Sequence, residues 1–427
     1  MDSVDTDVVI IGAGLAGLQC ARRLQRTGLR ATVLEAADTV GGRVRTERLD
    51  GFLCDRGFQV LNPAYPAVRA WIDTAALGLQ TFGTGVDVRT PEGMRTLASP
   101  LHHPGHALRT LRSGLLDTRD LAALARWMGP TMLRATAASR ATRDATLSAS
   151  LDAAGATGRL RRDVLDTFLA GVLADSTGQN SANYVRLLLR SFALATPGLP
   201  REGMQALPAQ MAASLRQPVR VSTPVDAVTE SPRTVSVHSS AGLVRARAAV
   251  LAVGPQDLPA LTTGSSLPQQ AAAPMHGLTT WWFAAPEPPT HSTFLRLDAS
   301  REGGGPAGPV WNTAVISNTA PSYAPPGQHL IQATTLLDRP DGRADEAAVR
   351  TDLGRIYGTS TRSWEVLAHH VLPHTLPAMP PPLVDRSPQR LSARVFVCGD
   401  HRDTGSIQGA MVSGDRAAQA VTGILAD

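Results

Sequence analysis

The feature that most constrains this chain is a glycine-rich turn near its beginning, placed between an apolar strand and a helix. Residues 7–11 (DVVII) form a β-branched run of strand length that leads directly into Gly12, Gly14 and Gly17. Apolar side chains then recur at helical spacing over residues 15–26. This succession of strand, GxGxxG turn and helix predicts the start of a dinucleotide-binding α/β fold of the Rossmann type.

The three glycines and the acid that follows them each suit one part of a dinucleotide. Gly12 permits the tight turn, Gly14 lets the backbone approach a pyrophosphate, and Gly17 lets the helix pack close to the strand. A second apolar strand over residues 31–34 ends at Glu35, whose carboxylate suits both ribose hydroxyls of an adenosine and repels a 2′-phosphate. The pattern therefore predicts an adenine dinucleotide other than NADP, with its phosphates at the helix N-terminus.

The charge composition excludes several kinds of chemistry. Lys and Arg together number 41 among 427 residues, and all of them are Arg, so no mechanism that needs a lysine is open to this chain. The formal net charge is +5, but the arginines are scattered and aromatic residues make up only 4%. This pattern does not favour nucleic-acid binding, and we predict no nucleic-acid partner.

The cysteines and the apolar runs bear on the cellular compartment. Cys20, Cys54 and Cys398 are an odd, widely spaced set without metal-ligand spacing, which suits structural thiols in a reducing cytoplasm. The first residues are acidic and lack the positive start of a signal peptide. The longest near-apolar run, residues 8–21, is too short and too rich in glycine to span a membrane. We therefore expect a cytoplasmic protein.

A second glycine pair helps to decide between NAD and FAD as the bound dinucleotide. Gly41, Gly42 and Arg43 come soon after Glu35, which a simple NAD domain does not need but a longer dinucleotide does. The stretch from DVVIIGAGLAGLQCARRL to VLEAADTVGGRVRT resembles the start of the flavin-containing amine oxidase and phytoene desaturase superfamily. This resemblance implies FAD as the cofactor, with the second glycine pair and Arg43 along its pyrophosphate and flavin.

Two later blocks extend the resemblance. Residues 394–398 (RVFVC) predict a strand, and the GDHRDTGSIQGAMVSG that follows resembles the closing flavin motif of the superfamily. The resemblance implies that Asp400 binds the ribityl or pyrophosphate region and that a helix starting near Ser406 points its N-terminus at the flavin. In the middle of the chain, residues 224–228 (PVDAV) resemble the strand whose Val225 meets the adenine.

The predicted cofactor site collects residues from all of these blocks. It also includes part of residues 55–66 (DRGFQVLNPAYP), which resemble a phytoene-desaturase-like subgroup of flavoproteins. The residues that we expect to bind FAD are Gly12, Gly14, Leu15, Ala16, Gly17, Glu35, Ala36, Gly41, Gly42, Arg43, Gly57, Phe58, Gln59, Val225, Gly399, Asp400, Ser406, Ile407, Gln408 and Ala410.

Because the three blocks are far apart in the chain, the cofactor domain must be assembled from separate segments. We predict an α/β fold with a Rossmann-like FAD-binding domain built from residues 1–95, 200–256 and 385–427. The intervening residues, 96–199 and 257–384, would form an interleaved α+β substrate domain. The middle strands of the FAD-binding domain are expected at residues 219–225, 234–238 and 247–253.

The predicted chemistry is that of the flavin. The chain has no second complete GxGxxG, so electrons taken up by the flavin are expected to leave to oxygen, a quinone or another carrier. Many members of the amine oxidase branch place a lysine near the flavin, and this chain has none. We therefore favour an FAD-dependent oxidoreductase that desaturates or oxidises a lipophilic, isoprenoid- or carotenoid-like molecule by hydride transfer. Three alternatives stay open, namely an amine oxidase that produces hydrogen peroxide, a redox-neutral isomerase and a scaffold without turnover.

Two histidines are candidates for catalysis. His374 precedes the closing motif and His401 lies within it, so the layout of the superfamily implies a position near the flavin for both, with a purely structural role as the alternative. His102, His103 and His106 have no Cys or carboxylate among them, so we predict no metal site.

Residues 101–150 combine an excess of positive charge with apolar side chains. They hold seven Arg and three Asp, together with leucine, methionine and tryptophan residues. The plainer interpretation is a helical cap with a solvated face. The alternative is a cap whose apolar face guides a lipophilic substrate and makes peripheral contact with an anionic membrane.

Overall fold

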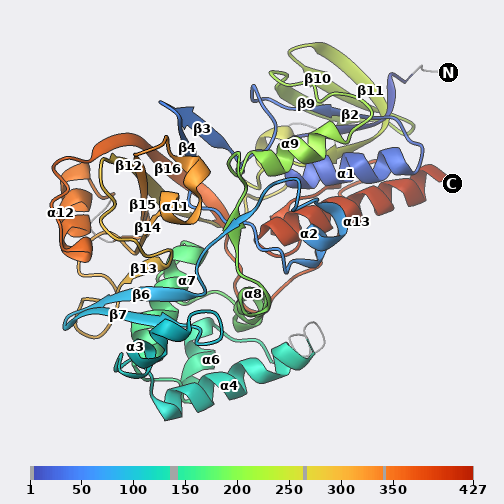
Figure 1. The fold of residues 1–427 in the computed structure, drawn as a ribbon. Helices are drawn as coiled ribbons and strands as arrows, with labels where there is room; N and C mark the ends of the chain where they lie inside the picture. The colour runs from blue at the N-terminus through green and yellow to red at the C-terminus, as the bar shows by residue number, and fades with distance from the viewer. Residues whose placement is uncertain (1–3, 135–142, 263–266, 340–342, 427) are drawn as a thin grey trace.

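The computed structural model describes residues 4–134, 143–262, 267–339 and 343–426, which form two lobes (Figure 1). One lobe is built on a six-stranded sheet and the other on a seven-stranded sheet. Both ends of the chain lie at the first lobe, so the polypeptide leaves this lobe and returns to it (Figure 1).

The six-stranded sheet joins strands from both ends of the chain to a meander from its middle. Its order is β2-β1-β11-β10-β9, and β17 pairs with β11. The pairs β1–β2, β1–β11 and β11–β17 are parallel, whereas β9–β10 and β10–β11 are antiparallel. The strands are β1 (Thr6–Ile11), β2 (Ala31–Leu34), β9 (Val225–Glu230), β10 (Val235–Ser239), β11 (Gly242–Leu251) and β17 (Val395–Val397).

Two helices from opposite ends of the chain lie side by side on this sheet (Figure 1). They are α1 (Leu15–Arg26) and α13 (Ile407–Ala426), and their buried apolar faces form one core with β1 and β2. Gly414 makes the close approach possible, because a Cβ there would lie 2.1 Å from the backbone oxygen of Ala16. The first and last segments of the chain are therefore held together by packing.

The seven-stranded sheet is the base of the second lobe. Its order is β16-β12-β15-β14-β13-β6-β7, and its pairs are antiparallel except for β13–β6. Trp281 and Phe283 share one face with the helix α12 (Glu346–Tyr357), and Trp282 points to the opposite face. The strands are β6 (Gly85–Thr90), β7 (Gly93–Ala98), β12 (Met275–Ala285), β13 (Leu295–Asp298), β14 (Asn312–Val315), β15 (His329–Leu336) and β16 (Glu365–Pro377).

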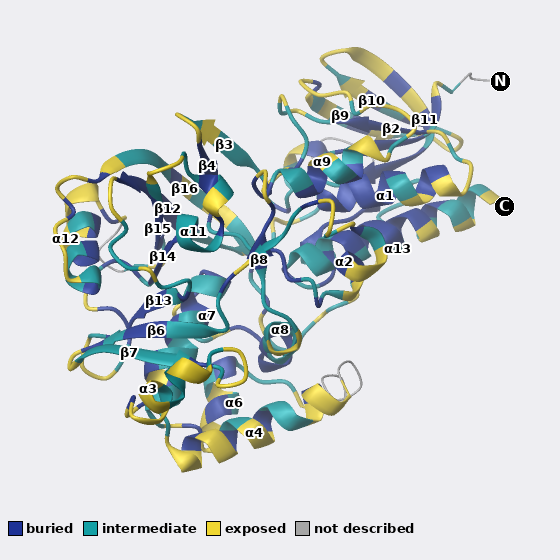
Figure 2. Cartoon of the chain, viewed as in Figure 1, coloured by how far each residue is buried: buried dark blue, intermediate teal, exposed yellow. Residues whose placement is uncertain are grey.

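A group of helices lies on the other side of this lobe, and the outer surface of α4 is largely exposed (Figure 2). These helices are α3 (Ala107–Leu111), α4 (Thr118–Leu133), α6 (Leu147–Ala154), α7 (Asp166–Leu173) and α8 (Ala182–Leu194). The smaller elements are β3 (Thr46–Leu49), β4 (Phe52–Asp55), α2 (Pro66–Trp71), β5 (Gln80–Thr81), β8 (Gly198–Leu199), α9 (Ala206–Ala213), α10 (Leu258–Thr262) and α11 (Ile316–Thr319).

The locally specified elements agree with the sequence-based predictions. The helix predicted over residues 15–26 and the strand predicted over residues 31–34 are observed with those bounds. The strands predicted at 234–238, 247–253 and 394–398 overlap β10, β11 and β17. The mixed α/β fold is confirmed. The helical cap expected within residues 101–150 is observed in part, and residues 135–142 lie outside the described residues.

The strand predicted over residues 219–225 is wrong except for its last residue, Val225, where β9 begins. Before that residue, Arg220 makes a single bridge to Leu34. Ser222 has a φ of 49°, in the left-handed region, and Pro224 has no N–H to donate, so both interrupt an extended ladder.

Sheet pairing bears on the predicted division into domains. The boundary expected at residue 95 falls within β7, and β6 and β7 pair with the seven-stranded sheet through β13. By hydrogen bonding, the first boundary would therefore lie before residue 85. The two-domain division itself stays a prediction.

Candidate functional site

A cavity of about 1190 Å³ is lined by residues from both lobes. Its walls come from the glycine-rich turn before α1, from β6 and β7, from α7 and α8, from the seven-stranded sheet and from the segment that leads into α13. Every residue predicted to bind FAD lines this cavity except Gly17, Gly57 and Gln408. The structure therefore brings the separate sequence blocks together, while the role of each residue stays a prediction.

The glycine-rich turn forms one wall of the cavity. Gly12 has a φ of 103°, and a Cβ there would lie 2.7 Å from the backbone oxygen of Ala252. A Cβ at Gly17 would lie 2.0 Å from the oxygen of Gly12, so this residue serves packing and not lining. A Cβ at Gly14 would meet open space, and no side chain caps the N-terminus of α1 there. The turn thus presents bare backbone and an uncapped helix end to the cavity, as a pyrophosphate requires.

Glu35 stands at the end of β2, next to this turn. Its Oε2 accepts a hydrogen bond from the backbone N–H of Ala13 at 2.6 Å, and its Oε1 accepts one from Ala37 at 2.9 Å. The two bonds fix the carboxylate at the cavity wall, and each oxygen keeps a further lone pair for a hydroxyl. This geometry fits the ribose-binding role predicted for Glu35.

Arg43 links the glycine pair to the closing motif. Its Nη2 donates to Oδ1 of Asp400 at 2.6 Å, and its Nη1 donates to the backbone oxygen of Thr375 at 2.8 Å. The side-chain amide of Gln59 donates in turn to the backbone oxygen of Arg43 at 2.8 Å. The cation therefore joins three distant segments beside the cavity, and it neutralises the nearly buried Asp400 carboxylate.

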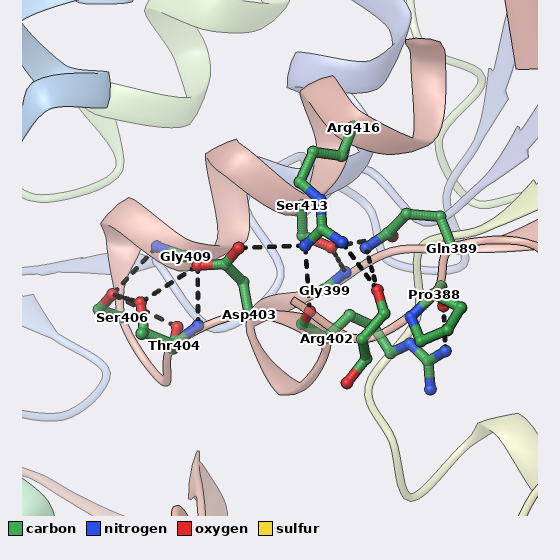
Figure 3. A network of polar contacts seen from close by, with 11 residues as sticks. Pro388, Gln389, Gly399, Arg402, Asp403, Thr404, Ser406, Gly409, Ser413 and Arg416 are labelled. Carbon is green, nitrogen blue, oxygen red and sulfur yellow. Dashed lines mark hydrogen bonds and ion pairs between the residues drawn. The ribbon is translucent and has the colours of Figure 1, made fainter. Parts of the chain in front are cut away.

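The closing segment between β17 and α13 is held by a polar network (Figure 3). The backbone N–H of Gly399 donates to Oγ of Ser413 at 3.0 Å, and Arg416 forms an ion pair with Asp403 at 3.2 Å. Oγ of Ser406 accepts a hydrogen bond from the N–H of Gly409 at 3.0 Å, so this hydroxyl caps α13. Burial raises the pKa of Asp403 to about 6. The network fixes the backbone that lines this end of the cavity.

The other half of the cavity is apolar. Apart from the hydroxyls of its tyrosines, its polar lining groups are hydroxyls and one amide, from Thr84, Ser99, Thr110, Thr196 and Asn312. Among the described residues, the carboxylates that line the cavity are Glu35, Asp257 and Asp400, all on the side of the glycine-rich turn or of the closing segment. The apolar lining residues are Phe58, Val60, Tyr65, Phe82, Val86, Leu97, Leu116, Val164, Phe168, Val172, Tyr184, Leu188, Phe192, Leu278 and Leu295.

Two tyrosines that the sequence analysis did not select lie at this cavity. The hydroxyl of Tyr184 donates to the backbone oxygen of Gly405 at 2.6 Å, next to the predicted flavin-binding segment. Burial raises the pKa of Tyr65 to about 12 and the pKa of Tyr184 further. Within the described residues, no group hydrogen-bonds to the Tyr65 hydroxyl. Tyr65 lies near the end of residues 55–66, the stretch that resembles the phytoene-desaturase-like subgroup, and this resemblance is the signal in the sequence that could have pointed to it.

The remaining predicted residues lie just outside the cavity lining. Gly57 has a φ of 94° and forms a turn, and the side chain of Gln408 accepts a hydrogen bond from the backbone of Ala67 at 2.8 Å. His374 is exposed on β16, beside the cavity-lining residues 375 and 376. Gly57, Gln408 and His374 are therefore not part of the cavity lining, and the roles predicted for them stay predictions.

His401 is mostly buried but does not line the cavity. Its ring lies close to the Cα of Gly399, where an added Cβ would lie 2.5 Å from the ring carbon Cε1. Burial lowers the pKa of His401 to about 4, so the ring is neutral at pH 7. The catalytic roles suggested for His374 and His401 stay predictions, and the geometry gives neither residue a position at the cavity wall.

The clustered histidines, His102, His103 and His106, contact other groups of the protein. Nε2 of His103 accepts a hydrogen bond from the backbone of Thr84 at 3.1 Å, and the rings of His103 and His106 both pack against Phe294. In the described part of the chain, no three His, Cys, Asp or Glu side chains are arranged to hold a metal ion.

Several exposed apolar side chains fall between residues 101 and 133. Leu101 is 90% exposed, and Leu108 and Leu111 of α3 are 65% and 71% exposed, while Thr110 of α3 lines the cavity. Leu121, Met132 and Leu133 of α4 are also exposed. None of the helices in the described ranges combines the length and apolarity needed to cross a bilayer.

The chain matches the family described as flavin-containing amine oxidoreductases over residues 15–422. Among curated proteins, a pseudooxynicotine dehydrogenase from a Pseudomonas species is 28% identical over 270 residues, which cover 59% of this chain and 52% of that protein. The chain thus matches about half, or less, of the length of its first curated relatives.

Solved structures share the fold along nearly the whole chain. A protein assigned as protoporphyrinogen oxidase from Exiguobacterium is similar with a TM-score of 0.73 and 19% identity, covering 99% of both chains. A fatty acid isomerase from P. acnes that produces CLA is similar with a TM-score of 0.72 and 16% identity, covering 98% of this chain and 99% of that one. At these identities the similarity shows the fold alone.

Proposed function

Because the chain belongs to the flavin-containing amine oxidoreductase family and is an FAD-dependent oxidoreductase, we propose that it oxidises or desaturates a lipophilic small molecule. The observation that carries this proposal is the apolar half of the cavity, where the described lining holds no carboxylate. An apolar wall of this extent stabilises apolar surface by roughly 25 cal/mol per Å² removed from water, and it offers a charged substrate no partner.

Residues in one half of the cavity would bind the cofactor, and residues in the other half would bind the substrate. The uncapped end of α1 and Glu35 would hold the dinucleotide, and Arg43 with Asp400 would fix the region between pyrophosphate and flavin. When bound, FAD supplies the hydride acceptor. The aliphatic and aromatic wall would exclude water and orient the substrate, with Tyr65 as a free hydrogen-bonding group at the boundary.

Oxidation of an amine, with release of hydrogen peroxide, is the second candidate. The observation that favours it is the pair of tyrosine rings in the cavity lining, the partly buried Tyr65 and the buried Tyr184, because aromatic faces attract an ammonium group. Against it stand the missing lysine and the lack of a carboxylate among the described residues of the apolar half. A neutral, lipophilic substrate is therefore the better match to this cavity.

Anaerobic mixing of the oxidised holoenzyme with matched probes tests the choice. We expect a neutral long-chain alkene or polyene to bleach the oxidised flavin absorbance, and a primary amine of equal chain length to leave it unchanged. Bleaching by the amine alone would contradict the proposal. Isomerised product that forms only after prior reduction of the flavin would point instead to the redox-neutral isomerase.

We further propose that the exposed leucines near the cavity contact an anionic membrane surface, through which such a substrate would arrive. Leu101, Leu108 and Leu111 would dip into the interface, while the exposed Arg109 and Arg112 would meet the lipid headgroups. Each arginine near such a surface contributes about 1 kcal/mol, which gives weak and salt-sensitive attachment.

Liposome flotation of the holoenzyme at low salt tests this contact. We expect binding to anionic vesicles and not to neutral ones, with a loss of about tenfold or more in a variant carrying Arg109→Gln and Arg112→Gln. The matched control replaces two exposed arginines elsewhere, Arg233→Gln and Arg362→Gln, and should bind as the wild type does. Equal losses in both variants would show a general charge effect and would contradict a specific face.

A further inference from the structure

One buried amide in the apolar half of the cavity has no hydrogen-bond partner among the described residues. Asn312, the first residue of β14, lines the cavity and is only 3% exposed. Its Oδ1 is buried without a hydrogen-bond partner, and within the described residues no group bonds to its Nδ2. An amide buried in this way costs about 1–3 kcal/mol unless a partner arrives, so it calls for an explanation.

The neighbouring strand residue shows that this sheet can satisfy its polar groups. Thr313, directly after Asn312, donates to the backbone oxygen of Gln332 at 2.5 Å and lies 3.0 Å from the hydroxyl of Tyr357. Thr279 and Thr335 pair with each other at 2.7 Å on adjacent strands. Other buried polar atoms of this sheet also lack a partner, among them Oγ1 of Thr280, Nε1 of Trp281 and Oε1 of Gln332. Within the described lining of the cavity, Asn312 is the residue of this group that the cavity reaches.

The other cavity-lining amides differ from Asn312 in this respect. Gln59 and Gln256 also have a buried side-chain oxygen without a partner. However, the Nε2 of Gln59 donates to Arg43 and the Nε2 of Gln256 donates to Asp257, so both are anchored within the protein. Asn312 is anchored by packing alone, in a wall that it shares with Val172, Leu278 and Leu295.

Gly171 of α7 makes room for this amide. A Cβ at position 171 would lie 1.9 Å from Nδ2 of Asn312, and Gly171 itself lines the cavity. The nitrogen end of the amide therefore sits where helix, sheet and cavity meet. At this position an N–H can donate to a bound molecule.

We infer that Asn312 is a specificity-determining residue that donates a hydrogen bond to a neutral oxygen of the substrate, a carbonyl or a hydroxyl. A carboxylate is a poorer match, because the cationic side chain that lines the cavity in the described residues is Arg43, on the cofactor side and already bonded to Asp400. The inference rests on the proposed lipophilic substrate and narrows it to a largely apolar molecule with one oxygen-bearing group.

Binding of two matched probes to the oxidised holoenzyme tests this inference. The probes are 2-dodecanone and dodecane, and the readout is the ligand-induced change in the flavin absorption spectrum, which gives a Kd without turnover. We expect the ketone to bind about tenfold more tightly than the alkane, because its oxygen would accept a hydrogen bond from the Nδ2 of Asn312 and the alkane offers no acceptor. Asn312→Leu should bring the two Kd values together mainly by weakening the ketone.

Two further variants separate recognition from general damage to the cavity. Gly171→Ala displaces the same amide from the helix side and should also abolish the preference for the ketone. Thr196→Val removes another polar lining group, one that already lies 3.2 Å from the hydroxyl of Thr84, and should keep the preference. If Asn312→Leu does not accumulate as holoenzyme, Gly171→Ala carries the test.

The possible results distinguish this inference from the proposed function. If the wild type binds both probes equally, or if Asn312→Leu keeps the tenfold preference, the role of Asn312 is overturned while the lipophilic substrate stands. If the wild type binds neither probe, the proposed function falls and the assignment of Asn312 falls with it.

Discussion

The two halves of the cavity are built in different ways. The cofactor half depends on backbone geometry, with glycines whose missing Cβ atoms allow contacts that no other residue permits, such as Gly17 against Gly12. The substrate half depends on side chains from six or more elements, where volume and polarity matter and no single backbone contact is decisive. Substitutions should therefore act abruptly in the first half and gradually in the second.

The largest effect should come from Gly17→Ala. The added Cβ would overlap the backbone oxygen of Gly12 at 2.0 Å, so α1 must move away from β1. We expect a loss of several kcal/mol in the free energy of unfolding, together with loss of FAD. The matched control is Gly14→Ala, whose Cβ meets open space, and which should keep the fold while weakening FAD binding. Equal melting temperatures for the two variants would contradict the claim that the close contact between Gly17 and Gly12 makes the cofactor half sensitive to substitution.

A pH-dependent effect should arise from Asp55, where the two lobes meet. This fully buried carboxylate accepts hydrogen bonds from Thr46, from the backbone of Met204 and from Tyr323, and burial raises its pKa to about 6. Because the folded-state pKa lies above the unfolded value of about 3.9, protonation stabilises the fold. That contribution is complete below about pH 4 and is lost as the pH rises to 6, a change on the order of 3 kcal/mol.

Asp55→Asn should remove this pH dependence, which chemical denaturation at pH 4, 5, 6 and 7 can measure. The pKa of Asp403, in the cofactor half, is also raised to about 6. Asp403 therefore still contributes its part of the pH dependence of the free energy of unfolding in the Asp55→Asn variant, and this remaining dependence is the internal reference. An unchanged slope between pH 4 and 6 in Asp55→Asn would show that Asp55 is not the titrating group.

A moderate effect, confined to the cofactor half, should follow Glu35→Ala. The substitution removes charge-assisted hydrogen bonds to the ribose, each of roughly 1.5–3 kcal/mol, so the Kd for FAD should rise about 10- to 100-fold. Equilibrium dialysis of the apoprotein with FAD measures this. Glu202→Ala, an exposed glutamate paired with Arg48, is the control and should leave the Kd unchanged. Unchanged affinity in Glu35→Ala would mean that this carboxylate does not reach the ribose.

The smallest effect should distinguish the two tyrosines at the boundary of the halves. Tyr184→Phe removes the hydrogen bond to Gly405 and should cost about 1 kcal/mol of stability. Tyr65→Phe removes a hydroxyl without a partner in the described residues and should leave the melting temperature nearly unchanged. If Tyr65→Phe is the more destabilising of the two, the hydroxyl of Tyr65 has a structural role that its position does not show.

The sequence by itself determined the cofactor half to a large extent. The helix over residues 15–26 and the strand over residues 31–34 were predicted with their observed bounds, because strand, turn and helix are specified by neighbouring residues. The predicted strand over 219–225 failed where a proline and a left-handed serine break the extended chain, a local conflict that periodicity alone does not reveal.

Only the tertiary structure decided the substrate half. Tyr65, Tyr184 and Asn312 come from an N-terminal turn, a helix and a strand that are more than a hundred residues apart, and no spacing in the chain connects them. A glycine motif carries its meaning within a few residues, because it describes the local path of the backbone. A binding wall takes its meaning from which side chains packing brings together, and in this protein that depends on the antiparallel order of the seven-stranded sheet against α7 and α8.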